Sequence, residues 1–419
     1  MTRTAPILSA DRRKRLVSEA LNLTIVLYAL LLPFSYAFTV FTGPLILLAL
    51  WLLEGGLAAK FKKIRSNRAI ALFLLFVALH LLSLLWSGEY HEASRILKFY
   101  FAIAIDLVVL STSLKRGYAT AALFAFLLSM FVSEVLLYGV FLEWWSFKKA
   151  SPQNPSPIMH HIFYSIFLAV TILLLLWQLF DPKVNKTLKL FELFFLTSAT
   201  FNLFLNGGRT GQLAFAIAVF VFVLTYFGFR KKYLVRTFTA IAVLFTVAYF
   251  ASPVFHARVH EGIRDVKGIV QGNLNSSWGL RIAMKKVGWE MAKEHPLLGA
   301  GVGDVMAQFH RQYEKSGLKD LPFLKTNTHV HDQYLQILLQ TGAAGLAVFL
   351  LFLYYLFRTP FEDPLTRAVF YGILTIFVFA FFVDVPLRKF TAGLFGFVIG
   401  YMLHRADIQT QANHQGVNG

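Results

Sequence analysis

The feature that most constrains this chain is a series of long apolar runs. Several of them reach the roughly 20 residues that an α-helix needs to cross a bilayer. Two examples are AIALFLLFVALHLLSLLWS at 69–87 and QYLQILLQTGAAGLAVFLLFLYYLF at 333–357. The composition agrees, because 57% of the 419 residues are hydrophobic and only 15% are charged. The sequence therefore predicts an all-α, polytopic membrane protein.

The apolar runs predict twelve transmembrane helices and one long polar segment. We expect nine helices within 1–254, a helical segment outside the membrane at 255–332, three helices within 333–404 and a polar tail at 405–419. The first run begins near Leu21, and its length predicts an anchor and not a cleaved signal peptide. The expected spans are 19–37, 40–57, 69–87, 94–111, 118–140, 160–180, 188–206, 210–229, 235–254, 333–357, 367–383 and 390–404.

Lysine and arginine predict the orientation of these helices. If the N-terminus lies in the cytoplasm, the cytoplasmic side holds 22 of the 40 basic residues. Cytoplasmic loops of membrane proteins carry such an excess, so both termini are expected in the cytoplasm and 255–332 on the external face. The same bias accounts for much of the net charge of +18, which indicates contact with anionic lipid and not with nucleic acid.

The most informative stretch is KTNTHVHDQYLQILLQTGAAG at 325–345, where the polar segment ends and an apolar helix begins. It places His329 and His331 at the expected boundary between water and membrane. A titratable ring at this depth can move protons where a lipid-borne substrate reaches it. Thr328 and Asp332 are also ordinary helix-start residues, so the stretch taken alone slightly favours a plain helix cap.

Basic side chains on the external face are also informative, because the charge rule does not require them there. Arg209 lies in the short turn NGGRTG, whose glycines let the backbone bend tightly, and its planar fork suits a phosphate oxygen. The alternative is an arginine that reaches to lipid head groups. Arg281 lies in a predicted helix with Lys285 one turn further on, and by itself it reads as a solvated charge. The turn FVDVPLRKF adds Asp384, Arg388 and Lys389.

Together these cations predict a positively charged external surface at a membrane entrance. A diphosphate that links a lipid to a sugar is a natural partner, because arginines neutralise the charge that builds on a diphosphate leaving group. A histidine can take the proton from an attacking hydroxyl. This chemistry needs no metal. His329 and His331 can ligate zinc only with a third ligand that the sequence does not show, and the absence of cysteine excludes thiolate sites.

At this point the residues resemble a known family. His331-Asp332, followed after nine residues by Gly342-Ala-Ala-Gly345, is similar to the signature of O-antigen ligases, which is a histidine, a small polar residue and a spaced G-x-x-G. Asp332 departs from the Asn, Ser or Gln that is usual in the family. The turn NGGRTG and the segment GLRIAMKKVGWEMAKEHPLLGAGVG also resemble motifs of the wider superfamily, and the layout of the helices is similar.

The resemblance implies a bacterial inner-membrane glycosyltransferase with a GT-C-like helical fold. Such an enzyme moves O-antigen from undecaprenyl diphosphate to lipid A–core oligosaccharide at the periplasmic face, in lipopolysaccharide biosynthesis. It works without a metal or other cofactor and inverts the anomeric centre. The catalytic residues implied by position are His331, Arg209 and Arg281. The residues expected to contact substrate are His329, Asp384, Arg388, Lys389 and Lys285.

Two other functions remain open at the level of sequence. An O-antigen polymerase or a protein O-oligosaccharyltransferase of the same superfamily shares these motifs. A transporter of an anionic, lipid-linked glycan is compatible with twelve spans and with Asp106 and Glu134 inside them, since acids within a membrane are usually paired or functional. A transporter has no obvious need for a long one-sided segment that ends in a histidine.

Overall fold

The computed structural model describes residues 10–148, 150–318 and 320–416, and these residues are almost entirely helical. Helices make up 79% of the described residues, and no strand is present in these ranges. The predicted fold class is therefore confirmed. The α-helices are α1 (Ala10–Leu31), α2 (Gly43–Glu54), α3 (Leu57–Ser66), α4 (Arg68–Leu82), α5 (Tyr90–Ser113), α6 (Arg116–Phe141), α7 (His161–Phe180), α8 (Lys186–Leu205), α9 (Arg209–Phe227), α10 (Lys231–Ala251), α11 (Pro253–Val270), α12 (Ser277–Glu294), α13 (Val305–Lys315), α14 (Gln333–Phe357), α15 (Pro364–Val383) and α16 (Lys389–Gly416).

Helices occupy all twelve of the expected transmembrane positions, although not all of them are equally apolar. Within the described residues, nine helices are long and apolar enough to cross a membrane, or ten if the bent pair Phe38–Glu54 and Leu57–Ser66 forms one span. Positive φ angles at Gly55 and Gly56 accompany the bend of 120° in that pair. The other two expected spans, α1 and α16, do not meet this criterion. Both carry basic residues within the helix, which reduces their mean hydropathy.

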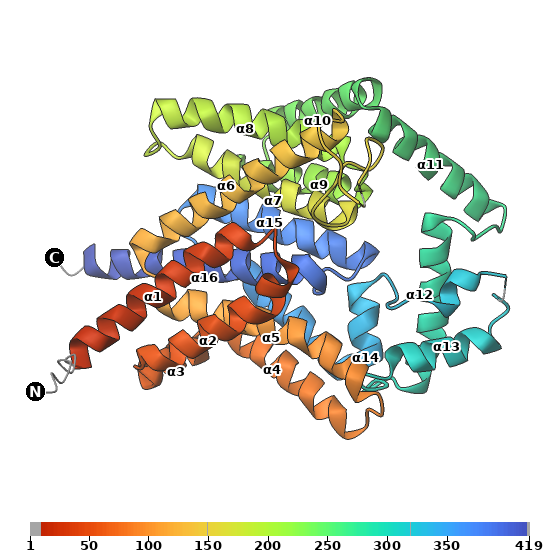
Figure 1. Cartoon of the computed structure of the whole chain (residues 1–419), viewed down its shortest axis with the longest axis horizontal. Coiled ribbons are helices and arrows are strands. Elements are labelled where there is room, and N and C mark those ends of the chain that lie inside the picture. The colour runs from red at the N-terminus through yellow and green to blue at the C-terminus, as the bar shows by residue number, and fades with distance from the viewer. Residues whose placement is uncertain (1–9, 149, 319, 417–419) are drawn as a thin grey trace, which may run out of the picture.

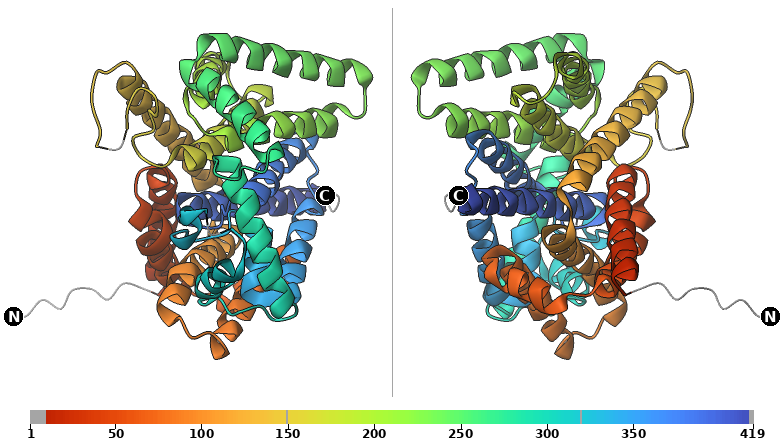
Figure 2. Two further views of the ribbon diagram at one scale, coloured as in Figure 1. Left: turned by 90° about the vertical axis from the view of Figure 1, so that its right-hand side faces the viewer. Right: turned by 90° about the vertical axis from the view of Figure 1, so that its left-hand side faces the viewer.

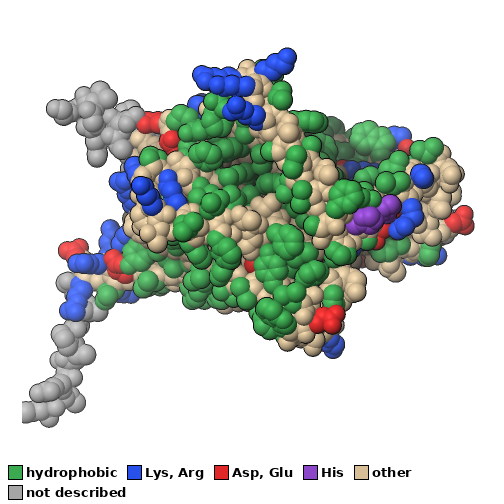
Figure 3. Space-filling model, turned by 90° about the horizontal axis from the view of Figure 1, so that it is seen from above, with side chains coloured by type: hydrophobic (Ala, Val, Ile, Leu, Met, Phe, Trp, Pro, Cys, Tyr) green, Lys and Arg blue, Asp and Glu red, His purple; other side chains and the backbone are tan. Residues whose placement is uncertain are grey.

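The helices form a bundle with the polar segment at one end. Figure 1 places the start of α1 and the end of α16 at the left, and α12 and α13 at the right. In the bundle α9 packs on α15, α5 on α16, α4 on α14 and α1 on α6. Figure 2 shows α10, the long green helix, at the edge of the bundle, in keeping with the 11% of its apolar window that is buried. Hydrophobic side chains cover much of the face in Figure 3, and Lys and Arg gather in clusters near its edges.

Three helices build the polar segment. The sequence predicted a helical segment at 255–332, and the structure has α12 and α13 there. It adds α11, an amphipathic helix that the sequence analysis did not predict. The side chain of Ser252 caps α11 and that of Ser276 caps α12 by accepting backbone N–H groups of the first turn. A small core joins α12 and α13 to the first turns of α14, with Met284, Val287, Phe309, Tyr313 and Leu339 fully buried.

A break in α14 fixes the polar segment to the bundle. Gly342 has φ 64° and ψ −164°, which lies outside the helical region. Because the break frees backbone groups on both sides of it, α14 pairs with the loop after α12 much as two strands would. The four hydrogen bonds are Ala300 N to Leu339 O (2.8 Å), Gly301 N to Gln340 O (3.1 Å), Ala343 N to Pro296 O (2.9 Å) and Ala344 N to Leu297 O (3.3 Å).

Candidate active site

His331 is held in an unusual backbone conformation just before α14. Its φ is +50°, which is uncommon for a residue with a side chain. Asp332 is the N-cap of α14, and its Oδ1 accepts the N–H of Leu335 at 2.9 Å. The helix cap expected from the sequence is therefore present, and it fixes the position of the residue before it. The ring of His329 lies 4.0 Å from that of His331, measured between centroids.

Asp384 is the acidic partner of His331. His331 Nδ1 lies 3.3 Å from Asp384 Oδ1, which is an ion-pair distance, although the ring is not turned for a straight hydrogen bond. The carboxyl is 3% exposed and accepts the N–H of Val385 at 2.8 Å. Burial opposes ionisation, but contact with His331, the nearby His329 and the Val385 N–H outweigh it and hold the pKa of Asp384 below its usual range. Asp384 is therefore a carboxylate at neutral pH.

His329 has a different electrostatic role. Burial, together with the charge of His331, lowers the pKa of His329 to about 3. At neutral pH its ring is therefore uncharged, and its Nδ1 faces the backbone N–H of His331 at 3.4 Å. Of the two histidines, only His331 contacts the carboxylate of Asp384 at ion-pair distance.

These three residues also form a possible metal-binding group. One ligand atom each from His329, His331 and Asp384 lies within 4.8 Å of the others. Asp384 supplies the third ligand, which the sequence did not show, because the loop between α15 and α16 folds against 328–332. Two imidazoles and a carboxylate suit zinc in type. The neighbouring cations Lys285 and Arg388 oppose the binding of a further cation.

A row of buried glutamines on α14 holds in place the two loops that carry His331 and Asp384. Gln333, Gln336 and Gln340 follow each other at i, i+3 and i+7, so they lie on one face of the helix, and none is more than 2% exposed. Gln336 Oε1 accepts the N–H of Val330 at 3.3 Å, and Gln333 Oε1 accepts the N–H of Leu387 at 3.1 Å. One helix face thus contacts the His331 loop and the Asp384 loop. The spacing of three glutamines in an apolar helix was the available sequence signal.

Gln340 anchors this row in the bundle. Its Oε1 accepts the hydroxyl of Tyr100 at 2.9 Å and lies 3.2 Å from Nε2 of His80. His80 comes from α4 and Tyr100 from α5, and both are fully or almost fully buried. Buried polar groups of this kind are costly unless they are paired, so the network helps to fix α14 in one register against α4 and α5.

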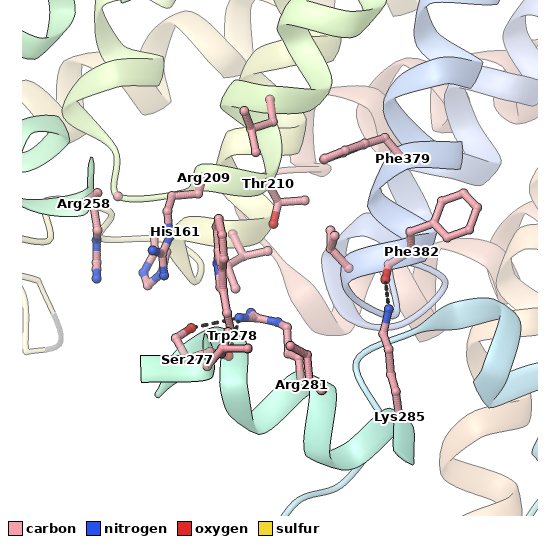
Figure 4. Close-up of a pocket in the computed structure, with 16 residues that line it drawn as sticks. His161, Arg209, Thr210, Arg258, Ser277, Trp278, Arg281, Lys285, Phe379 and Phe382 are labelled. Atoms are coloured by element: carbon pink, nitrogen blue, oxygen red, sulfur yellow. Dashed lines mark hydrogen bonds between the residues drawn. The ribbon is translucent and has the colours of Figure 1, made fainter. Parts of the chain in front are cut away.

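Beside the cluster of His329, His331 and Asp384 lies a cavity of about 390 Å³ with a basic lining. Figure 4 shows Arg281 and Lys285 extending from α12, with Arg209, Arg258 and His161 on the other side. His331 and Asp384 do not line the cavity, but Val383 and Lys285 do. The remaining lining residues are Ile162, Gly207, Thr210, Leu213, Ile269, Ser277, Trp278, Ile282, Phe379 and Phe382.

Arg209 begins α9 and is fixed by groups from α11 and α12. Its Nη2 lies 3.6 Å from Asp265 Oδ2, and its guanidinium lies 5.2 Å from the ring of Trp278. Its Nη1 is buried and has no hydrogen-bond partner within the described part of the chain. A buried donor without a partner is costly, so it is suited to a ligand oxygen. The close packing of Gly208 and Gly211 on Ser165 explains two of the three glycines of the NGGRTG turn.

Lys285 connects the cavity to the histidine pair. Its Nζ lies 2.8 Å from Asp332 Oδ2, next to His331, and donates to the carbonyl of Phe382 at 2.6 Å, two residues before Asp384. The charge of Asp332, which departs from the family signature, thus pairs with a lysine. Arg281, one turn earlier on α12, donates to the carbonyl and hydroxyl of Ser277 at 3.0 and 2.8 Å. Its Nε has no hydrogen-bond partner among the residues described.

In the structure the predicted site residues form two adjacent groups, and one residue, Lys389, lies apart from both. Arg209, Arg281 and Lys285 line the cavity, whereas His329, His331 and Asp384 form the cluster next to it. Arg388 Nη1 donates to the carbonyl of Thr328 at 2.9 Å and so ties the two loops of this cluster. Lys389 lies instead over the ring of Phe163, at 5.4 Å. Sequence reasoning missed Arg258, Asp265 and Trp278, all of which lie on α11 or α12.

Comparison with known protein families gives a match over the middle of the chain. Residues 193–350 match a family model described as O-Antigen ligase, whose members are glycosyltransferase-like enzymes. The match covers Arg209, Arg281 and His331 and ends before Asp384. No curated protein gives a significant match to the chain. Residues 193–350 of this multi-pass membrane protein are therefore similar to the O-antigen ligase family, which is the family that the sequence motifs resemble.

Proposed function

We propose that this protein is an O-antigen ligase. It transfers O-antigen polysaccharide from undecaprenyl diphosphate to a sugar hydroxyl of lipid A–core oligosaccharide. The observation that carries the proposal is the pair His331–Asp384 beside a cavity lined by Arg209, Arg281 and Lys285. A proton acceptor next to a basic cavity is what displacement of a diphosphate by a hydroxyl requires.

In the proposed reaction the acceptor hydroxyl attacks the anomeric carbon of the donor glycan. His331 takes the hydroxyl proton as the new C–O bond forms. The bond between the anomeric carbon and the diphosphate breaks, and its electron pair leaves with undecaprenyl diphosphate. Attack from the face opposite the leaving group inverts the anomeric centre. Asp384, as a carboxylate, keeps the ring of His331 in place and stabilises its protonated form.

The basic residues of the cavity receive the negative charge that develops on the diphosphate. Arg209 has a buried donor nitrogen that finds no hydrogen-bond partner among the described residues, and Arg281 has one as well. Both are arginines, which bind phosphate oxygens through a planar fork. Lys285 lines this cavity and also pairs with the cap residue Asp332, so it contacts both parts of the candidate site. No metal takes part in this proposal, in line with the expectation from the sequence.

The proposal also includes the placement of the chain in the cell. The polar segment 255–332 faces the periplasm, the transmembrane parts 1–254 and 333–404 lie in the bacterial inner membrane with a GT-C-like arrangement, and both termini are cytoplasmic. The tail predicted at 405–419 is cytoplasmic, and its last residues, 417–419, lie outside the described ranges. Single cysteines introduced at an exposed position of α13 and at one of α3 test this orientation. Their labelling by a membrane-impermeant reagent shows which side of the membrane each position faces.

A gel of lipopolysaccharide from a deletion strain tests the function. A ligase predicts loss of all O-antigen from lipid A–core, with long polymer accumulating on the lipid carrier. Products with a single repeat unit indicate a polymerase instead, and unchanged lipopolysaccharide with loss of glycoprotein indicates a protein oligosaccharyltransferase. Transfer by the purified protein in detergent, where there is no bilayer to cross, rules out transport as its sole activity.

A further inference from the structure

A second polar cavity lies at the far end of α14 from His331. It has a volume of about 440 Å³ and is bordered by residues of α3, α4, α5, α14 and α16. α14 has 25 residues, and at 1.5 Å per residue it separates the two sites by roughly 37 Å. The cavity is therefore not part of the candidate active site. Its lining consists of Lys63, Ser66, Asn67, Arg68, Ala69, Ser111, Tyr355, Arg358, Thr359, Pro360, Leu403, Ala406 and Asp407.

The lining has more positive than negative charge. It contains Lys63, Arg68 and Arg358, against the single acid Asp407. Lys63 Nζ lies 2.6 Å from Asp407 Oδ2, so this acid is paired with the lysine. Within the described ranges, no salt bridge engages Arg68 or Arg358. Two arginines are thus left to bind an anion in the same cavity.

Neighbouring groups position one of these arginines. Arg68 Nη1 donates to the hydroxyl of Tyr355 at 3.2 Å, and its guanidinium lies 5.4 Å from the centre of that ring. Arg358 is the C-cap of α14 and follows Tyr355 by three residues, so both arginines border the cavity at the same end of that helix. The general excess of cytoplasmic lysine and arginine does not require such convergence. Lys62 and Arg65, on the same helix as Lys63, are exposed and do not line the cavity.

The remaining lining suits a lipid better than a soluble anion. Ser66, Ser111 and Thr359 supply hydroxyl groups, whereas Ala69, Leu403 and Ala406 supply apolar surface. The cavity lies where α4 begins and α14 ends, and both helices are apolar enough to cross a membrane. At the ends of such helices lie the phosphate groups and upper acyl chains of the surrounding lipid. Basic pockets between transmembrane helices are known binding sites for lipid head groups.

We propose that this cavity binds the phosphate of an anionic membrane phospholipid, with Arg68 and Arg358 contacting the phosphate oxygens and the apolar wall contacting the glycerol and upper acyl region. The site holds a structural lipid at the end of the bundle opposite the polar segment. This inference does not depend on the proposed ligase function. A free phosphate ion has the same charge but cannot use the apolar wall.

Native mass spectrometry of the full chain in detergent tests the proposal with phosphatidylglycerol and phosphatidylcholine as probes. The double variant Arg68→Ala/Arg358→Ala is compared with Lys62→Ala/Arg65→Ala, which removes the same charge from the same end of the bundle but leaves the cavity intact. We expect the wild type and the control to retain phosphatidylglycerol in preference to phosphatidylcholine. We expect the cavity variant to bind phosphatidylglycerol at least about tenfold more weakly.

Each other outcome overturns the proposal. Equal loss in the cavity variant and the control means that phosphatidylglycerol responds to total charge and not to a site. Equal retention of both lipids means that the arginines do not select an anion. Displacement of phosphatidylglycerol by millimolar inorganic phosphate means that the cavity takes a soluble anion. All four substituted residues are exposed or partly exposed, and a thermal unfolding curve confirms that each variant is folded.

Discussion

The break in α14 predicts a large effect for Gly342→Ala. Gly342 has φ 64° and ψ −164°, a region that residues with a Cβ almost never occupy. A Cβ built there lies 2.2 Å from the backbone carbonyl of Leu297. That atom belongs to the backbone of the docked loop, so no side-chain rotation relieves the clash. The loop that ends α12 must therefore move away from α14.

The magnitude follows from two contributions. Backbone strain at such an angle costs about 1–3 kcal/mol. Moving the loop removes the hydrogen bonds from Ala343 N to Pro296 O and from Ala344 N to Leu297 O, and their loss adds about 1–3 kcal/mol. The total is about 2–6 kcal/mol, and at about 2 °C for each kcal/mol it lowers the melting temperature by about 4–12 °C.

Gly228→Ala is a matched control. Gly228 ends α9 with φ 72° and ψ −174°, almost the same backbone angles as Gly342. No atom lies within 4 Å of a Cβ built at Gly228, so this variant carries the strain without the clash. Thermal unfolding of both variants in detergent, followed by tryptophan fluorescence, separates the two contributions. Equal shifts in melting temperature for the two variants would refute the argument that the loop docks through Gly342.

Three further predictions concern the candidate site. Lys285→Met removes the ion pair next to His331 and one cation from the edge of the cavity, so glycan transfer falls by at least about tenfold. Lys286→Met, at an exposed position, retains wild-type transfer in the same assay. Equal transfer rates for the two variants would contradict the role of the cavity. Gln336→Leu leaves the buried backbone N–H of Val330 unpaired, at a cost of about 1–3 kcal/mol. We expect it to lower kcat more than it changes KM. A change in KM alone would argue that Gln336 does not position the His331 loop. The folded state lowers the pKa of His329 to about 3, so the unfolded chain binds a proton first as the pH falls below about 6.5. Stability therefore drops as the pH falls from about 6.5 towards about 3. Melting temperature measured against pH should drop less in His329→Gln.

The fold class and one half of the site could be predicted from sequence for a simple physical reason. A membrane forces each apolar run of sufficient length into a helix, and the excess of lysine and arginine on one side makes cations on the other side conspicuous. Arg209 and Arg281 were predicted to be such cations, and both line the cavity. Asp332 is a helix cap, as its position in the sequence indicated.

The rest of the site depends on contacts between distant segments. His331 and Asp384 are 53 positions apart, and nothing in either local sequence indicates that the loop after α15 folds onto the residue before α14. Asp265 on α11 pairs with Arg209 at the start of α9, although the two residues are 56 positions apart in the sequence. The sequence marks Gly342 as part of a glycine motif, but its non-helical backbone angles are explained only by the loop that packs against it.

Glycan transfer by the purified protein in detergent tests the central claim most directly. The assay supplies a lipid-linked glycan and lipid A–core, and it compares the wild type, His331→Ala and His295→Ala, an exposed histidine on the same segment. We predict that His331→Ala remains folded but loses transfer by at least about 100-fold, while His295→Ala and the wild type in EDTA remain fully active. Full transfer by folded His331→Ala would contradict the account.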